Sequence, residues 1–216
     1  MNGADASTTF TDETGRTWTR YGDSQIDTAE YKFGGASGLF DGTGDYLSAA
    51  NSADFDFGTG DWTIDFWVRR NGVSAYRGVI GAASESGVGW CLGMSKYLDG
   101  KIELTSKASG VWKVDLTMSE ASVNTEWAHI AWVRNGNSVD AYLNGVSKGT
   151  KEVTGYTYNS AGIGASIGRL YPDANNYYWV GHIDEMRISK GIARWTGNFT
   201  PPTREYRCGG LFTFHG

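Results

Sequence analysis

Turn-forming residues divide this sequence into short segments, and their spacing constrains the fold more than any other feature. Glycine, asparagine and aspartate recur about every 8–12 residues, the spacing of strands in a β-sandwich or barrel. Of the 216 residues, 31 are glycine, only 3 are proline, and 14% are aromatic, which suits short strands joined by tight turns. No stretch has a convincing helical period. We therefore predict an all-β fold, an antiparallel sandwich of two sheets.

Two segments alternate in the way that predicts a half-buried strand. The first is DWTIDFWVRR at 61–70, in which Ile64, Phe66 and Val68 share one face and the residues between them face the other way. The second is YYWVGHIDEMRISKGIAR at 177–194. Between these segments, two further strand patterns flank an Asn-Gly-Asn sequence at 135–137, which predicts a hairpin.

Asp184, in the second segment, raises a question of charge. Strict alternation places it on the same face as Met186 and Ile188, with Ile183, Glu185 and Arg187 on the other. If that face is the core, the ionised carboxylate needs a partner, because an unpaired buried charge costs about several kcal/mol or more. The partner is either a basic side chain or a bound cation with oxygen ligands.

The charge of the chain argues against two classes of partner. There are 19 basic and 24 acidic residues, a net charge of −5, and no basic cluster. Nucleic acids and anionic membrane surfaces both need a positive footprint, so we expect neither. No apolar run of about 18 residues is present to span a membrane. A buried thiol at Cys91 is favoured over a disulfide with Cys208.

Five segments together carry a family resemblance. They are GLFDGTGDYLS (38–48), GTGDWTIDFWVR (58–69), EWAHIAWVRNGNSVDAYLNG (126–145), IGR (167–169) and VGHIDEMRISKGIARWTGNFTPPT (180–203). In order and spacing they resemble the laminin G-like, concanavalin A-like jelly-roll family. The resemblance implies one jelly-roll domain over residues 1–206, followed by a tail at 207–216. The last segment is most similar to modules of tailed-phage virion proteins and bacterial surface proteins.

The resemblance also implies a structural calcium ion. Family members that bind calcium are similar to this chain at the FDG turn and at the IDE of the last long strand. Asp41 and Asp184 would then be side-chain ligands, and Asp45 a third. Calcium takes about 6–8 oxygen ligands, and the glycine-rich turn at 42–44 could add backbone carbonyls.

Hydrogen bonding offers an alternative to the ion at these acids. Asp41, in its glycine-rich turn, would form an Asx turn. Asp184 would pair with Arg169, Arg187 or a backbone amide. In both interpretations the role of the acids is structural.

Aromatic residues in or beside the expected loops are candidates for glycan binding, because aromatic rings stack on flat apolar faces. The candidates are Tyr97, Trp112, Tyr156, Tyr158, Tyr171, Tyr177 and Tyr178. Packing inside the sandwich is the competing interpretation for each of them. Trp62, Trp67, Trp127 and Trp132 lie on expected strands and should pack in the core or on a sheet face.

No grouping of side chains indicates catalysis. Some relatives of this fold hydrolyse β-glucans, and retaining hydrolysis needs carboxylates about 5–5.5 Å apart. The nearest acids here lie in Thr63-Ile64-Asp65 and Ile183-Asp184-Glu185, and by alternation neither segment sets two acids on one face. We therefore expect a non-enzymatic binding or adhesion module that recognises glycans on a virion or cell surface. The alternative is a structural phage decoration or fibre protein that docks on capsid or tail proteins.

The two ends of the chain suggest a further strand. Similar phage modules begin with an apolar strand before the NGAD segment, and the sequence here starts at Met1 without one. The N-terminus lacks the apolar run of a secretory signal, so either the chain is assembled in the host cytoplasm or a signal has been removed from an extracellular protein. A start at Met1 without a leader favours the structural virion role. Leu211–His215 has the pattern of such a strand. We expect this strand to pair at the vacant edge, either in its own chain or in a neighbouring copy. Pairing with a neighbouring copy would make a homo-oligomer. The alternative is a frayed tail.

Overall fold

The structure is a computed structural model, in which the described residues form strands and a single short helix. It describes residues 3–71, 77–84, 89–95, 101–108, 111–119, 126–160, 162–170, 177–206 and 212–215. The elements are β1 (Phe10–Asp12), β2 (Thr17–Tyr21), β3 (Gln25–Asp27), β4 (Ser37–Asp41), β5 (Tyr46–Ser48), η1 (Ala53–Phe55), β6 (Trp62–Arg70), β7 (Arg77–Ala83), β8 (Gly89–Ser95), β9 (Lys101–Ala108), β10 (Val111–Ser119), β11 (Ala128–Asn135), β12 (Ser138–Leu143), β13 (Val146–Glu152), β14 (Ser166–Ile167), β15 (Val180–Lys190) and β16 (Phe212–His215). Within these ranges no helix is long and apolar enough to cross a membrane.

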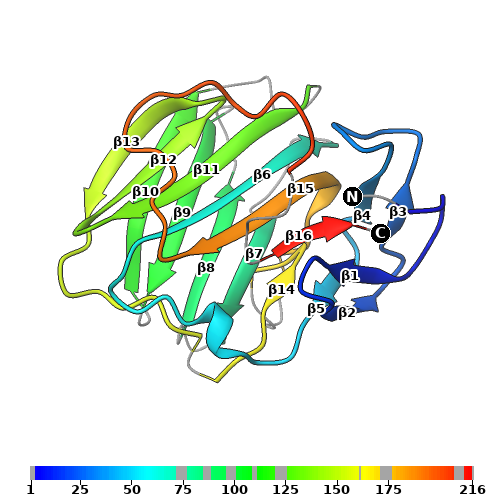
Figure 1. Cartoon of the computed structure of the whole chain (residues 1–216), viewed down its shortest axis with the longest axis horizontal. Coiled ribbons are helices and arrows are strands. Elements are labelled where there is room, and N and C mark those ends of the chain that lie inside the picture. The colour runs from blue at the N-terminus through cyan, green and yellow to red at the C-terminus, as the bar shows by residue number, and fades with distance from the viewer. Residues whose placement is uncertain are drawn as a thin grey trace.

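The strands form two antiparallel sheets packed face to face, as predicted (Figure 1). The first sheet runs in the order β10-β9-β8-β7-β14-β5-β2. The second runs in the order β3-β4-β15-β6-β11-β12-β13. The predicted hairpin at 135–137 is confirmed, since Asn135 pairs with Ser138 across the turn between β11 and β12.

The C-terminal strand connects the two sheets at one edge. β16 pairs with β15 on one side, through Thr213 and Arg187, and with β1 on the other, through His215 and Thr11. In this structure both of its neighbours belong to the same chain, and Figure 1 shows β16 between β15 and β1. β1 in turn pairs with β2 of the first sheet.

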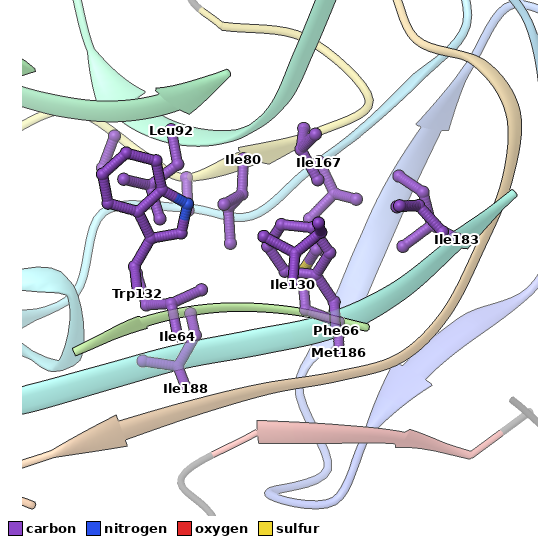
Figure 2. Close-up of a cluster of buried hydrophobic side chains, with 14 of the residues drawn as sticks. Ile64, Phe66, Ile80, Leu92, Ile130, Trp132, Ile167, Ile183, Met186 and Ile188 are labelled. Atoms are coloured by element: carbon purple, nitrogen blue, oxygen red, sulfur yellow. The ribbon is translucent and has the colours of Figure 1, made fainter. Parts of the chain in front are cut away.

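The core lies between the two sheets and is built from their facing side chains. Figure 2 shows Ile64 and Phe66 of β6 and Trp132 of β11 opposite Ile80 and Leu92 of the first sheet. Each of these side chains is at most 1% exposed, and full burial of a large apolar side chain contributes about 1.5–3 kcal/mol. The predicted inner face of β6 is therefore confirmed.

A β-bulge in β15 overturns the alternation predicted for that strand. Asp184 pairs with Trp67 of β6, and Arg187 pairs with Asp65, so that two residues of β15 stand against one of β6. Glu185, inside the bulge, has φ of +49°, a left-handed conformation that non-glycine residues rarely adopt.

The bulge decides which side chains of β15 reach the core. Ile183, Met186 and Ile188 all point into it (Figure 2). Asp184 points away from the core. It pairs directly with Trp67 of β6, and directly paired residues share one face of a sheet. Trp67 faces outward because its neighbours Phe66 and Val68 point into the core. The expectation that Asp184 shares a face with Met186 and Ile188 is wrong, since the inserted residue shifts the phase of the strand.

The chain after β15 covers the outer face of the second sheet. We call residues 192–206 the strap. Trp195 and Phe199 of the strap stack with ring centroids 3.9 Å apart and planes within 6°. They pack against Ala131, Val133 and Tyr142 on the outside of β11 and β12. The strap therefore covers the outer side of β11 and β12.

Candidate functional site

The outer face of the first sheet carries a group of parallel tyrosine rings. Tyr21 of β2 lies directly opposite Tyr46 of β5. Leu47, which follows Tyr46, points into the core, so Tyr46 and its partner Tyr21 both point outward. Their ring centroids are 4.3 Å apart and their planes differ by 6°. Tyr178 lies 6.1 Å from Tyr46 with planes 16° apart. We call Tyr21, Tyr46 and Tyr178 the tyrosine stack.

An arginine belongs to the same stack. The guanidinium carbon of Arg169 lies 3.5 Å from the ring centroid of Tyr46, and its Nε donates a hydrogen bond to Oγ of Ser166 over 3.2 Å. Burial raises the pKa of Tyr46, although the charge of Arg169 opposes this. The phenol of Tyr46 is therefore neutral at physiological pH, and the cation stabilises the stack through its contact with the ring.

An aspartate-rich turn lies beside Tyr21. Asp45 is 1% exposed and accepts hydrogen bonds from the backbone N–H groups of Asp23, over 2.5 Å, and Asp41, over 2.8 Å. Burial raises the pKa of Asp45, and these two hydrogen bonds partly offset the effect. A Cβ at Gly22, which has φ of +65°, would lie 2.3 Å from Oδ1 of Asp45. Glycine at this position therefore lets the turn close around the carboxylate.

The predicted calcium ligands do not converge on one point. Asp41 pairs with Val180 at the start of β15, and Asp184 lies four residues further along the strand, about 13 Å away at the usual rise of about 3.3 Å per residue. Among the residues that the structure describes, no three acidic, histidine or cysteine side chains are arranged to hold a metal ion. Asp41, Asp45 and Asp184 therefore do not fit one shared calcium site.

The hydrogen bonds of these acids match the alternative interpretation. Oδ1 of Asp41 accepts the backbone N–H of Thr43 over 2.6 Å, an Asx turn. Oδ2 of Asp184 accepts the backbone N–H groups of Lys32, over 2.9 Å, and Phe33, over 3.1 Å. Its Oδ1 accepts the N–H of Glu185 over 2.8 Å. Asp184 thus ties the loop before β4 to the bulge.

The predicted aromatic candidates lie in several different places. Tyr178 joins the tyrosine stack. Tyr158 is 1% exposed and packs against Trp62 in the core, whereas Tyr156 is 36% exposed in a turn. Tyr177 is half-buried against Ala83, Cys91 and Leu170. Trp112 lies in β10, and its side chain, like Tyr97 and Tyr171, lies outside the part of the chain that the structure describes.

Sequence reasoning missed Tyr21 and Tyr46. Their contact depends on the register between β2 and β5, which are separated by two other strands in the sequence. The alternation of TWTRY at 17–21 around the buried Trp18 would have placed Tyr21 on an outer face. Nothing in the sequence identifies its partner across the sheet.

A second polar cluster lies buried beneath the strap. Asp65 is fully buried and accepts hydrogen bonds from Nε and Nη2 of Arg187, at 3.0 and 2.8 Å, and from the hydroxyl of Tyr206 at 2.5 Å. Nε2 of His129 lies 3.0 Å from the same hydroxyl. Burial alone would raise the pKa of Asp65, but the hydrogen bond from His129 and the charge of Arg187 outweigh it and lower that pKa.

The bulge places two acids of β15 on this same outer face, so the expectation that Ile183-Asp184-Glu185 sets no two acids on one face is wrong. Oε2 of Glu185 accepts the backbone N–H of Tyr206 over 2.5 Å. Asp184 and Glu185 are at most 1% exposed. Both carboxylates therefore hold neighbouring chain segments in place. Beside this cluster, a groove of about 430 Å³ is lined by Arg187 and strap residues 200–206.

The family model described as the concanavalin A-like lectin/glucanases superfamily, a laminin G model, matches residues 41–194. The chain belongs to this superfamily. Its description covers both lectins and glucanases, so membership alone does not separate binding from catalysis. Comparison with curated protein sequences gives no match.

Solved structures share the fold at low sequence identity. Domain 4 of an extracellular arabinanase from Geobacillus stearothermophilus, in complex with arabinotriose, has a TM-score of 0.60 at 19% identity, covering 84% of this chain and 79% of that one. A heptameric pentraxin from Limulus polyphemus has a TM-score of 0.57 at 17% identity, covering 75% and 76%. The botulinum neurotoxin type C structure, whose description names two ganglioside molecules, has a TM-score of 0.56 at 15% identity, covering 84% of this chain and 46% of that chain.

Proposed function

We propose that this chain is a non-catalytic carbohydrate-binding module that takes its ligand on the tyrosine stack. The observation that carries the proposal is the exposure of Tyr21, which is 44% exposed although one face of its ring packs on Tyr46. An open aromatic face suits the apolar face of a sugar ring. The side chain of Asp23, 94% exposed in the turn that follows Tyr21, can accept hydrogen bonds from sugar hydroxyls.

The rings of the stack pack on one another in the absence of a ligand. Tyr46 supports Tyr21 from behind, and Arg169 covers Tyr46. Binding to a ring already held in place loses little side-chain entropy, which is what raises affinity in preorganised sites. The arrangement therefore supports recognition without movement of the sandwich.

The acids of the second sheet support a non-catalytic role. Asp65 and Glu185 are buried beneath the strap and bonded to Tyr206. Glycoside hydrolysis needs two carboxylates that flank a bound substrate. These two are bonded within the protein and are covered, so they do not meet that requirement.

The fold relatives support a saccharide as the ligand class. The description of one names arabinotriose and that of another names ganglioside molecules. Because their identities to this chain are 19% and 15%, they indicate the ligand class and no particular residue.

We further propose that the module acts at a virion or cell surface. The support is the similarity of residues 180–203 to modules of phage virion and bacterial surface proteins. Binding of the purified protein to emptied phage capsids, with no binding to glycans, would favour the structural decoration role instead. A structural calcium ion stays a prediction of the family resemblance alone, because Asp41, Asp45 and Asp184 do not fit one shared site. Metal analysis of the purified protein tests it.

A glycan array followed by calorimetry tests the carbohydrate proposal. We expect Tyr21→Ala to weaken binding by about tenfold or more, which corresponds to about 1.4 kcal/mol. Tyr31→Ala is the matched control, because Tyr31 is 46% exposed and lies outside the stack. Equal binding by both variants and the unaltered protein, or binding of no glycan by any of them, would refute the proposal.

A further inference from the structure

We infer that the tyrosine stack holds a single sugar ring, and that this ring carries no negative charge. The inference rests on the proposed function and narrows its ligand class. It follows from two features of the site: the way the rings are arranged, and the sign of the charges beside the open ring.

The rings are piled on one another instead of lying side by side. The planes of Tyr21, Tyr46 and Tyr178 are parallel to within 6° and 16° for the two successive pairs. A surface that binds a long sugar chain needs several rings lying in a row, each offering a face to a different sugar. In a pile, the faces of the inner rings are used up by their neighbours.

Tyr46 in particular has neither face available. Tyr21 covers one side at a centroid distance of 4.3 Å. The guanidinium carbon of Arg169, 3.5 Å from the Tyr46 centroid, cannot enter that gap and therefore covers the other side. The second face of Tyr21 is left, and among the described residues the only ring that contacts Tyr21 is Tyr46. Tyr178, at the other end of the stack, is partly buried, so Tyr21 is the one exposed ring of the three. One aromatic face accommodates one sugar ring.

Acidic residues outnumber basic ones around the turn that follows Tyr21, where Asp23, Asp41 and Asp45 lie with Arg20. Asp23, Asp41 and Asp45 lie close enough for the charges of the first two to raise the pKa of the third. Asp23 is 94% exposed, beside Tyr21. A carboxylate or sulfate on the ligand would meet these acids at short range, where repulsion costs about fivefold or more in affinity. Sugar hydroxyls, by contrast, can donate hydrogen bonds to a carboxylate.

The nearby cations do not reverse this preference. Arg20 donates hydrogen bonds to the carbonyl of Gly22, one of 3.0 Å from Nε, and its Nη2 lies 3.5 Å from Asp23. Arg169 lies on the far side of Tyr46 from Tyr21, as the distances above require. The cation of Arg20 is thus paired locally, and that of Arg169 is separated from the open face by the thickness of two rings.

Calorimetric titration with defined saccharides tests the inference. The probes are glucose, galactose and arabinose, their oligomers of about two to five residues, and oligomers of glucuronic and galacturonic acid. For the neutral saccharide series that binds, we expect the Kd, corrected for the number of sugar residues in each oligomer, to change by less than about twofold as the oligomer lengthens. The reason is that no second subsite contributes. The matching uronic acid series should bind at least about fivefold more weakly.

A charge variant separates the acid effect from other causes. Asp23→Asn keeps the shape of the side chain and removes its charge, so it should reduce the difference in affinity between neutral and acidic ligands. Glu126→Gln removes the same charge from an exposed position just before β11 of the second sheet and should leave the difference in affinity between neutral and acidic ligands unchanged.

The outcomes distinguish this inference from the function on which it rests. Affinity that rises with each added residue would overturn the single-ring site, and equal or tighter binding of uronic acids would overturn the neutral ligand. Either result, combined with loss of binding in Tyr21→Ala, would leave the carbohydrate function standing. Binding of none of the probes would overturn both.

Discussion

The rings of Tyr21 and Tyr46 stack across the ladder between β2 and β5, 4.3 Å apart and nearly parallel. Aromatic pairs of this kind contribute about 0.5–1.5 kcal/mol beyond the area they bury. Here the pair also leaves one ring face open on the outside of the sandwich. Under the proposed function, packing and ligand recognition therefore depend on the same two side chains.

Replacing Arg169 with lysine should weaken the stack. A lysine ammonium has no planar face to lie against Tyr46 and no guanidinium fork to reach Ser166, so the substitution is not conservative here. We expect a loss of stability of about 0.5–1 kcal/mol in urea unfolding and a fall of a few fold in glycan affinity. Unchanged affinity and stability would mean that Arg169 does not support the platform.

Gly22 allows the aspartate turn to close beside Tyr21. In Gly22→Ala, the new methyl group would meet Oδ1 of Asp45 and move the turn that carries Asp23. Gly15→Ala is the matched control, with φ of +80° and open space around its Cβ position. Both variants should lose about 1–2 kcal/mol from the left-handed backbone. Gly22→Ala should lose more, because its Cβ would also lie 2.7 Å from the carbonyl oxygen of Gly44, and only Gly22→Ala should also lose glycan affinity. Equal glycan affinities of Gly22→Ala and Gly15→Ala in calorimetry would contradict a role of this turn in binding.

Tyr206 locks the strap onto the second sheet. Burial, followed by the charge of Asp65, raises the pKa of its phenol well above the ordinary value, so the hydroxyl stays a donor. Tyr206→Phe removes a hydrogen bond to a charged group and should cost about 1.5–3 kcal/mol in urea unfolding. Glycan binding should be unaffected, because the strap and the tyrosine stack lie on opposite sheets. Tyr31→Phe, at an exposed position, is the control and should change neither the free energy of unfolding nor glycan binding.

Glu185 should make the protein less stable at neutral than at mildly acidic pH. Burial raises the pKa of Glu185, and the hydrogen bond from Tyr206 only partly opposes this. A carboxyl with a raised pKa in the folded state contributes stability below its unfolded pKa of about 4.3, and that contribution is lost as pH rises through the folded value. Glu185→Gln keeps an acceptor for the Tyr206 N–H and removes the titration.

Urea unfolding at a series of pH values tests the role of Glu185. The unaltered protein should lose stability relative to Glu185→Gln as pH rises from about 4 to about 7. Asp65, whose pKa is lowered, acts in the opposite direction: its contribution is present above about pH 4 and is lost below it. Parallel stability curves for the two proteins would show that Glu185 does not titrate in this range.

The sequence predicts the parts of the fold in which regular alternation continues without interruption. The faces of β6 follow from its pattern, because nothing interrupts that strand between Trp62 and Arg70. β15 departs from its pattern at Glu185, where a bulge occurs without the glycine that would have signalled a left-handed residue. That single inserted residue turned Asp184 away from the core and changed its partner from a hypothetical cation to three backbone amides.

The candidate site was harder to predict, for a related reason. Tyr178 was identified from its place beside an expected loop, whereas Tyr21 and Tyr46 meet only because β2 and β5 pair in one particular register. Long-range register depends on the packing of the whole sandwich and leaves no local mark in the sequence. The sequence places Asp41 and Asp45 on either side of the glycine-rich turn at 42–44, but the backbone amides that donate hydrogen bonds to their carboxylates depend on the three-dimensional fold.

Chemical-shift mapping by NMR, with a neutral saccharide that binds in calorimetry, tests the central claim most directly. If the tyrosine stack is the site, the largest shifts should occur at Tyr21, Asp23 and Tyr46 and should disappear in Tyr21→Ala. Shifts confined to the strap residues 200–206 beside the groove, with Tyr21 unmoved, would contradict the account.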